Sequence, residues 1–162
     1  MRLAPLLSAA IFSLAACEVG PEEEPPELEE IEASTPVRLR NVRTGECLRH
    51  QYGTLRKGGC ENQAANWGIA TLGGRFGNLS IIIARDNGTS GHIAIDPSTR
   101  LAFLAPNDQS TADSWFHWLS VGGDHAFEVQ TTGGRLGISS TGAIDAIIST
   151  SDRRRWTMLP PY

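Results

Sequence analysis

The chain has 162 residues, of which 40% are hydrophobic, and a formal net charge of −4 at pH 7. Residues 18–32 contribute −8 to this charge, whereas residues 37–162 carry 13 Lys and Arg against 10 Asp and Glu. This composition excludes a strongly basic domain. The mild excess of positive charge in residues 37–162 argues neither for nor against nucleic-acid binding by itself. We expect no nucleic acid as a partner.

Residues 1–16 have the features of an export signal. Arg2 supplies the positive charge, a short apolar stretch follows, and small residues end the segment. The apolar stretch is too short to span a bilayer. Leu14-Ala15-Ala16-Cys17 resembles a bacterial lipobox, whose cysteine is lipidated and becomes the mature N-terminus. We therefore expect a lipoprotein anchored at Cys17, and an ordinary signal peptide is the alternative.

Residues 17–36 read as an acidic linker rich in Glu and Pro. Residues 18–32 contain eight Glu. A stretch of this composition cannot bury enough apolar surface to offset the entropy of ordering it. We expect a mobile spacer that holds the folded domain off a membrane. This predicts a lipid-anchored protein of the bacterial cell envelope, at the outer membrane or surface, or released from it.

Residues 37–162 contain three internal repeats, with bounds of about 37–73, 74–122 and 123–162 and offsets of 46 and 43 residues. A unit of this length must pack on its copies to bury its apolar face. Three copies favour a closed threefold structure over an open solenoid, which would need polar end caps. The corresponding positions include Gly45/Gly91/Gly134, Cys47/Ile93/Leu136, Leu55/Leu101/Ile144, Gln63/Gln109/Asp152 and Trp67/Trp115/Trp156.

The local pattern within the repeats is β throughout. Apolar and charged residues alternate over 37–40 and 127–130, and Ile81–Ile83 is a short run of strand-forming residues. Turn pairs such as Asn87-Gly88 and Gly133-Gly134 separate these segments. No segment shows a sustained helical spacing, so we expect helices of a single turn at most. About 125 residues suffice to bury a core.

The three cysteines are an odd number for an exported protein. If Cys17 takes the lipid, Cys47 and Cys60 remain, with twelve residues between them. The pair can close a disulfide within the first repeat, which the loop-entropy model values at roughly 3 kcal/mol. A zinc site is the competing use, but two cysteines without a nearby pair of histidines make a poor ligand set.

The first repeat resembles the repeat of ricin-type β-trefoil lectins. The resemblance lies in Gly45-Glu46-Cys47-Leu48, Cys60-Glu61-Asn62-Gln63 and Trp67, and the second repeat keeps Asp108-Gln109. It covers residues 37–162 and implies a β-trefoil that binds carbohydrate. The short spacing of the cysteines and the C-terminal Trp156-Thr157-Met158-Leu159-Pro160-Pro161 also resemble the A and C subunits of cytolethal distending toxin. That likeness implies toxin-like partner subunits and a delivery role.

The chain departs from the lectin pattern where the family places a sugar-binding acid. The corresponding residues are Arg49, Ile95 and Ile138, and none of them accepts hydrogen bonds from sugar hydroxyls. Asp96 follows one position later and would face the opposite side of a strand unless a bulge shifts it. Gln63 and Gln109 either orient a ligand or satisfy backbone groups at a turn. The ligand-binding candidates are His50, Tyr52, Asn62, Gln63, Asp96, Asp108 and Gln109.

Two further clusters attract attention. Trp115-Phe116-His117-Trp118 is the densest aromatic segment, and strict alternation places Trp115 with His117 and Phe116 with Trp118. One pair should fill the core, with the other partly exposed or covered by a loop. Arg153-Arg154-Arg155 is interpreted as a solvated turn, or as a contact for anionic glycan or lipid head groups.

No catalytic motif stands out. Ser90 lies in Gly88-Thr89-Ser90-Gly91-His92, but a nucleophile elbow needs a following helix, which the pattern does not predict. The four histidines show no metal spacing, and there is no phosphate-binding loop. We therefore expect no enzyme, metal or cofactor.

Two hypotheses of function follow. The first is a lipid-anchored lectin-like module for carbohydrate or another cell-surface ligand, such as a toxin-delivery subunit. The second is a structural or protein-interaction lipoprotein whose trefoil no longer binds sugar. The missing acids favour the second, and the retained Asn62-Gln63 and Asp108-Gln109 favour the first.

Overall fold

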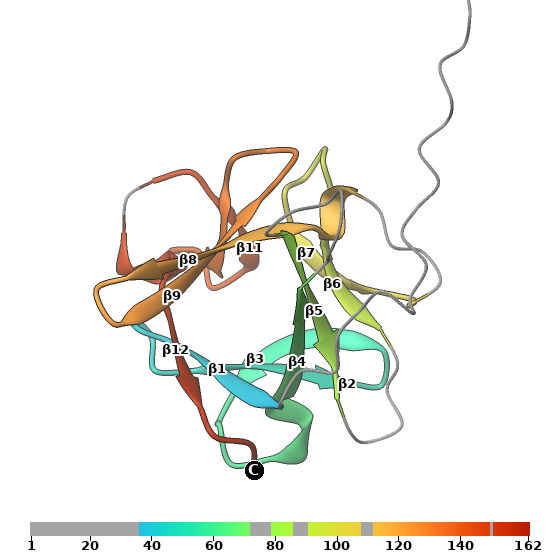
Figure 1. Cartoon of the computed structure of the whole chain (residues 1–162), viewed down its shortest axis with the longest axis vertical. Helices are drawn as coiled ribbons and strands as arrows, with labels where there is room; N and C mark the ends of the chain where they lie inside the picture. The colour runs from blue at the N-terminus through green and yellow to red at the C-terminus, as the bar shows by residue number, and fades with distance from the viewer. Residues whose placement is uncertain (1–35, 72–78, 86–90, 108–111, 150) are drawn as a thin grey trace, which may run out of the picture.

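A computed structural model describes residues 36–71, 79–85, 91–107, 112–149 and 151–162. Within these residues the structure is built from strands, with three short 3-10 helices as the only helical elements. The strands fall into three groups of four, as the three repeats predict (Figure 1). The first group is β1 (Val37–Asn41), β2 (Cys47–Gln51), β3 (Thr54–Gly58) and β4 (Asn66–Thr71). The second is β5 (Leu79–Ala84), β6 (His92–Ile95), β7 (Ala102–Ala105) and β8 (Phe116–Val121). The third is β9 (Asp124–Val129), β10 (Arg135–Ile138), β11 (Ile144–Ile147) and β12 (Trp156–Leu159).

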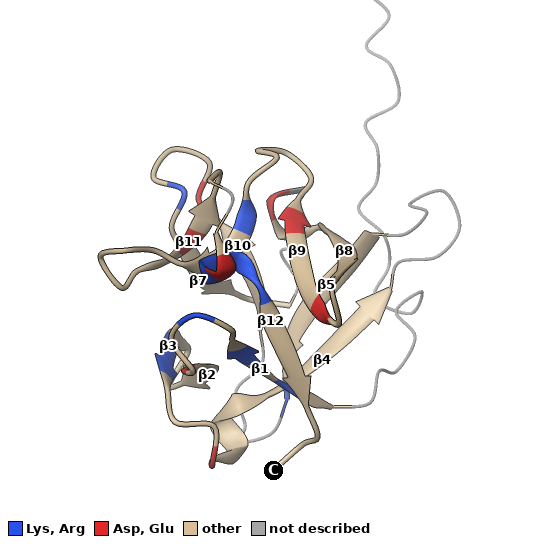
Figure 2. Cartoon of the chain, turned by 90° about the vertical axis from the view of Figure 1, so that its left-hand side faces the viewer, with Lys and Arg blue, Asp and Glu red and all other residues tan. Residues whose placement is uncertain are grey.

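The outer strands of each group form a closed barrel. β1 pairs with β4 and β12, β5 pairs with β4 and β8, and β9 pairs with β8 and β12, all antiparallel. Closure removes the unpaired edges that an open sheet would expose. The middle strands form three hairpins, β2–β3, β6–β7 and β10–β11, which gather on one side of the barrel (Figure 2). This arrangement is the β-trefoil that the repeats and the resemblance predict.

The core contains corresponding residues from all three repeats. These are Leu48, Ile93 and Leu136, each fully buried. The sequence alignment had paired Cys47 with Ile93 and Leu136 and is one position off in the first repeat. The backbone N–H groups of Asn41, Ala84 and Val129 donate to the carbonyls of Glu46, Gly91 and Gly134 respectively, so these three acceptors correspond. The other fully buried large side chains come mostly from the barrel strands and include Trp67, Trp156, Phe116, Phe127 and Ile82. The regular recurrence of buried positions explains why a threefold sequence pattern gives one shared core.

In the second repeat the core aromatic is Phe116 and not Trp115, which corrects the sequence alignment. Each last strand is preceded by a 3-10 helix: η2 (Gln63–Ala65), η4 (Ala112–Ser114) and η5 (Asp152–Arg154). Trp67, Phe116 and Trp156 each stand four positions after the first residue of the preceding helix. The insertion in the second repeat is therefore three residues long. The spacing from Gln109 to Trp115, compared with that from Gln63 to Trp67, had indicated two.

The strict alternation expected for residues 115–118 is also only partly correct. Phe116 is fully buried, but Trp118 remains 41% exposed and donates its Nε1 hydrogen to Nδ1 of His125 at 3.0 Å. Trp115 packs on a smaller apolar cluster that contains Leu79 and Ile81. Trp118 is paired with Phe127 across β8 and β9, and the centroids of the two rings are 6.4 Å apart, so it covers the edge of the core.

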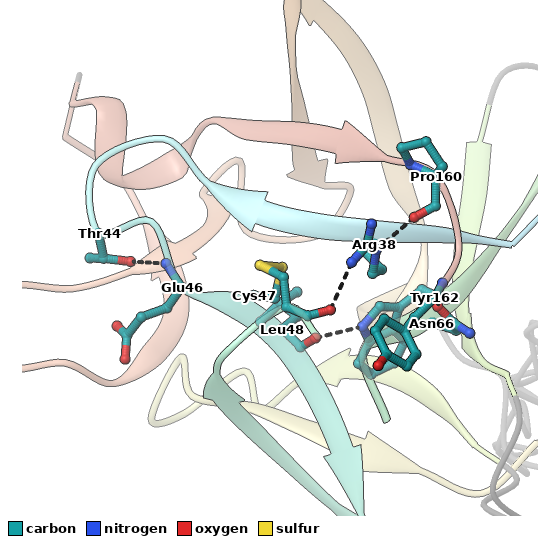
Figure 3. Close-up of a disulfide and its surroundings, with 10 residues drawn as sticks. Arg38, Thr44, Glu46, Cys47, Leu48, Asn66, Pro160 and Tyr162 are labelled. Atoms are coloured by element: carbon teal, nitrogen blue, oxygen red, sulfur yellow. Dashed lines mark hydrogen bonds between the residues drawn. A yellow bond between two sulfur atoms is a disulfide. The ribbon is translucent and has the colours of Figure 1, made fainter. Parts of the chain in front are cut away.

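The disulfide between Cys47 and Cys60 is present, with their Cα atoms 5.1 Å apart (Figure 3). It ties the start of β2 to the segment before η2, within the first repeat. Arg38 on β1 reinforces this region, because its Nη1 donates to the carbonyl of Cys60 at 2.9 Å and its Nε to that of Pro160 at 2.6 Å. The predicted pairing is confirmed, and it leaves neither thiol for zinc.

Candidate functional site

An open groove of about 670 Å³ lies beside the disulfide in the first repeat. Its polar lining comes from β1, from β2 and from the segment before η2, and consists of Arg38, Arg40, Arg49, Glu61 and Asn62. Three arginines against one glutamate make the groove positively charged. A groove of this charge suits a ligand that carries carboxylate or sulfate groups.

Strand geometry explains how the arginines reach the groove. Residues two apart on a strand share a face, so Arg38 and Arg40 point to the same side of β1. On β2 the same rule places Arg49 opposite the buried Leu48 and His50. Arg49 also lies directly across from Arg56 on β3, a pairing of like charges that costs stability.

Sequence reasoning identified Arg49 as the replacement for the lectin acid but missed Arg38 and Arg40. A signal for them exists in the sequence. The alternation Val37-Arg38-Leu39-Arg40 directs both arginines away from the core in which Leu39 is fully buried. What the alternation cannot show is that β1 brings them beside Arg49, since Arg40 is paired with Cys47 across the strands.

The structure places His50 in the core and not at the surface. Its side chain is fully buried, with the ring edge-on to Trp67 at a centroid distance of 4.9 Å. Nε2 of His50 donates to the backbone carbonyl of Asn66 at 3.0 Å. His50 therefore belongs to the core, because alternation along β2 turns it inward together with Leu48.

Tyr52 is the most exposed of the large hydrophobic residues in the described part of the chain, at 89%. It forms the β2–β3 turn together with Gly53, and both residues have positive φ, +50° and +69°. Such two-residue turns favour Asn or Gly, so an aromatic residue here is strained. Strain at an exposed ring is compatible with a contact role. Tyr52 does not line the groove, however, and the structure does not join it to Asn62.

Asn62 and Gln63 stand at the start of η2, and both are exposed. Oδ1 of Asn62 accepts a hydrogen bond from the backbone N–H of Ala64 at 2.7 Å, so the side chain caps the helix. Its amide nitrogen makes no hydrogen bond within the described residues. Gln63 makes no side-chain hydrogen bond within the described residues, so its expected structural role finds no support there.

Asp96 serves the β6–β7 turn. Its Oδ1 accepts hydrogen bonds from the hydroxyl of Ser98 at 2.7 Å and from the backbone N–H groups of Ser98 and Thr99 at 2.8 and 2.9 Å. These bonds, the Ser98 hydroxyl first, lower the pKa of Asp96 to about 2. One carboxylate oxygen is thus committed to the turn.

The remaining candidates, Asp108 and Gln109, lie outside the described residues, as does Cys17. The position of η4 nevertheless changes the alignment at Gln109. Because η4 begins at Ala112, that residue and not Gln109 corresponds to Gln63.

The described part of the chain contains no group of three or more His, Cys, Asp and Glu side chains that could hold a metal ion. None of its helices is long and apolar enough to cross a membrane.

Comparison with known proteins supports the fold alone. No protein-family model matches the chain, and no curated protein sequence matches it. Among solved structures, the BEL β-trefoil in an apo crystal form superposes with a TM-score of 0.67 at 13% identity, over 80% of this chain and 95% of that one. The designed threefold-symmetric protein ThreeFoil gives 0.64 at 11% identity, over 76% and 97% of the two chains.

An endo-β-galactosidase from Clostridium perfringens that releases GlcNAcα1-4Gal also gives a TM-score of 0.64, at 15% identity. The match covers 78% of this chain but only 33% of the enzyme, so this chain corresponds to about a third of that protein. These similarities, together with the closed barrel and its three hairpins, establish that the described part of residues 37–162 adopts a β-trefoil fold.

Proposed function

We propose that this protein is an exported lectin-like module that binds acidic carbohydrate through the groove of the first repeat. The observation that carries the proposal is the basic groove beside the disulfide, in which Arg40, Arg49 and Asn62 are brought together. The similarities to other trefoils support a binding module in general.

The chemistry of the groove favours acidic sugars over neutral ones. A lectin acid accepts hydrogen bonds from paired sugar hydroxyls, and Arg49 can only donate. A guanidinium group instead pairs with a carboxylate or sulfate through two parallel hydrogen bonds. Asn62 adds an amide donor for a neighbouring hydroxyl. The acidic group of the sugar would thus take the place next to Arg49.

A single shallow site of this kind should bind weakly, near millimolar or about −4 kcal/mol. Useful affinity would come from several copies on one surface, which a lipid anchor at Cys17 would provide. The acidic linker of residues 17–36 would let these copies reach ligands beyond the membrane.

A glycan array probed with clustered protein tests this proposal. We expect binding to unsulfated glycans with sialic or uronic acid, which Arg49→Gln and Asn62→Ala/Gln63→Ala both abolish. The unfolding midpoint of Arg49→Gln should not fall, because the change removes the like-charge pair with Arg56. Arg56→Gln is the matched control, because it removes the same charge from the facing strand and lies outside the groove. An array that stays blank under multivalent display contradicts the proposal, and so does equal loss with Arg56→Gln.

A second candidate function, protein interaction, is favoured by an apolar surface on the hairpins. A depression of about 450 Å³ there is lined by apolar residues of all three hairpins, Leu55, Leu101, Ala102 and Ile144, with Arg56 and Lys57 at its side. Leu101 is 46% exposed, and so is Phe103 two residues further along the extended chain. Toxin-like partner subunits would use such a surface, and a DNase-like protein encoded next door would support that role. Loss of in-cell crosslinks in Leu101→Asp, together with a blank array, would favour this function.

A further inference from the structure

A second groove, in the third repeat, concentrates arginine side chains from separate parts of the chain. It measures about 460 Å³ and lies where the turn before β12 meets the β1–β2 turn. Five arginines line it: Arg43, Arg135, Arg153, Arg154 and Arg155. Asp152 is the only acidic residue among its described lining residues. The segments that carry these arginines lie on the side of the molecule that faces the viewer in Figure 2.

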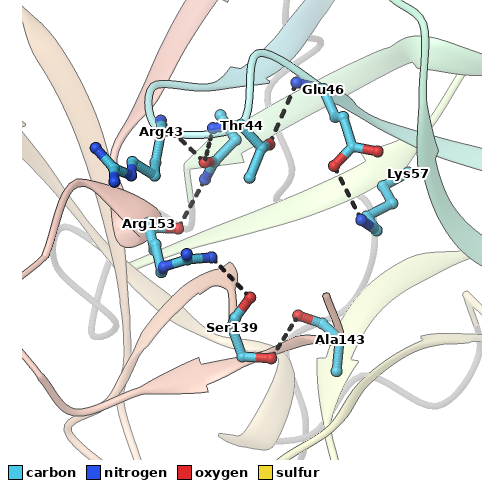
Figure 4. A network of polar contacts seen from close by, with 8 residues as sticks. Arg43, Thr44, Glu46, Lys57, Ser139, Ala143 and Arg153 are labelled. Atoms are coloured by element: carbon cyan, nitrogen blue, oxygen red, sulfur yellow. Dashed lines mark hydrogen bonds and ion pairs between the residues drawn. The ribbon is translucent and has the colours of Figure 1, made fainter. Parts of the chain in front are cut away.

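Asn41 fixes the two turns relative to each other. Its side chain is fully buried. Nδ2 donates to the carbonyl of Arg153 at 2.7 Å, and Oδ1 accepts from the backbone N–H groups of Arg43 and Thr44, both at 3.1 Å (Figure 4). The backbone N–H of Val42 also donates to the carbonyl of Arg155 at 3.0 Å. The arginines therefore project from a backbone that is already ordered, which lowers the entropic cost of binding.

The close packing of η5 on β10 holds the other side of the groove. A Cβ atom at Gly137 would lie 2.6 Å from the carbonyl oxygen of Arg153 and 3.0 Å from Cα of Arg154. Only glycine lets the two backbones approach this closely. The position of residues 153–154 thus depends on Gly137.

Three of the arginines already have partners. Arg155 forms ion pairs with Asp124 at 2.8 Å and Asp152 at 3.0 Å, and Arg135 pairs with Glu128 at 3.1 Å. Nη1 of Arg153 donates to the carbonyl of Ser139 at 2.9 Å, a neutral acceptor that leaves its charge uncompensated.

Arg43 and Arg154 make no side-chain hydrogen bond or ion pair within the described part of the chain. Partial burial and, after it, the nearby guanidinium of Arg135 lower the pKa of Arg154, while Glu128 opposes the shift. The hydroxyl of Ser151, another lining residue, is buried without a hydrogen-bond partner among the described residues. The groove therefore has two uncommitted guanidinium groups and a hydroxyl, and it has more positive charge than its acids neutralise.

We propose that this groove is a second binding site, for the sulfate group of an acidic oligosaccharide, with Arg43 and Arg154 as its main contacts. Guanidinium groups match the paired oxygens of a sulfate ester, and a concave site of this size accommodates a sugar unit. A membrane surface fits less well, because the largest apolar side chain in the lining is Val121. The site shares no lining residue with the first-repeat groove, so either proposal can fail alone.

Binding of a heparin hexasaccharide and of its desulfated, N-acetylated form tests the proposal, measured by calorimetry. The full chain with Cys17→Ser is used, so that no lipid anchor confuses the comparison with anionic vesicles of phosphatidylglycerol. We expect Arg43→Gln and Arg154→Gln each to raise the Kd for the sulfated sugar roughly tenfold. Arg154→Lys should give a Kd between those of the wild type and Arg154→Gln, because lysine keeps the positive charge but cannot donate two parallel hydrogen bonds. Arg56→Gln, the matched charge control, should change the Kd less than about twofold.

Three results would overturn the proposal. The first is equal weakening by Arg56→Gln, which would show diffuse attraction to the whole surface. The second is equal affinity for the desulfated sugar. The third is binding to the vesicles without binding to the free hexasaccharide, which would assign the groove to a membrane surface. Unchanged unfolding midpoints of Arg43→Gln and Arg154→Gln confirm that any loss reflects the site, since neither side chain has a hydrogen-bond or ion-pair partner to lose among the described residues.

Discussion

Trp67 and Trp156 occupy corresponding places in the first and third repeats, and each indole makes the same buried hydrogen bond. Nε1 of Trp67 donates to the carbonyl of Leu48 at 3.1 Å, and that of Trp156 donates to the carbonyl of Leu136 at 2.9 Å. Both rings are fully buried. In the second repeat Phe116 fills the same place, so a phenyl ring is compatible with the site but leaves the carbonyl without this donor.

Trp156→Phe should therefore lower the free energy of unfolding by about 1–3 kcal/mol, because a buried carbonyl loses its hydrogen bond. Trp156→Ala should cost more, about 3–5 kcal/mol, because it also opens a cavity. Urea denaturation followed by circular dichroism measures both. A loss below about 0.5 kcal/mol for Trp156→Phe would show that the hydrogen bond contributes little.

Removal of the disulfide should destabilise the domain without changing its fold. The bond closes a loop with a sequence separation of 13, and Cys47→Ala/Cys60→Ala should lower the free energy of unfolding by about 3 kcal/mol. Alkylation of the native protein followed by mass spectrometry should find no free thiol at either position. Two reactive thiols in the native protein would contradict the pairing.

Gly137→Ala should destabilise the third repeat by about 1–3 kcal/mol, because the new Cβ meets the backbone of residues 153–154. The same change should weaken binding of the sulfated hexasaccharide by displacing Arg154. Gly59→Ala is the matched control, since a Cβ there meets nothing within 4 Å. Thermal unfolding of the two variants gives the comparison, and equal midpoints would show that η5 can shift at no cost.

His92 should make stability depend on pH in the acidic range. Burial lowers the pKa of His92 below 6.5, and a hydrogen bond with the side chain of Asn107 offsets only part of this shift. The unfolded state then binds a proton more readily than the folded state. The contribution of His92 is therefore fully present above pH 6.5 and is lost as the pH falls through the lower, folded-state pKa.

Urea midpoints at about pH 7.5 and about pH 5.5 test this expectation. The wild-type midpoint should fall more between these values than that of His92→Gln. His117→Gln, a substitution at an exposed histidine, should follow the wild type. Parallel curves for wild type and His92→Gln would contradict the assignment.

Cys17→Ser should move the protein from the membrane fraction to the soluble exported fraction, because Cys17 would carry the only lipid. Fractionation of expressing cells, followed by immunoblotting, measures the shift. A chain that is soluble with Cys17 intact would contradict the anchor and leave the ordinary signal peptide as the explanation.

The sequence alone determined the class of fold, the threefold repeat and the disulfide. These features depend on short-range patterns: glycine pairs mark the turns, alternation marks the strands, and Cys47 and Cys60 lie within one repeat. Corresponding apolar residues such as Ile93 and Leu136 also had to be buried together, because a single repeat cannot cover its own apolar face.

Only the tertiary structure decided which residues form the candidate sites. An insertion in the second repeat shifted the core aromatic from Trp115 to Phe116, and the spacing of single residues could not fix its length. His50 was a ligand candidate in the sequence, but its side chain points into the core from β2. Arg43 and Arg153 are more than 100 positions apart, and the buried amide of Asn41 joins them only because β1 pairs with β12 when the barrel closes. Barrel closure is a long-range event, so no local pattern in the sequence announces the groove that it creates.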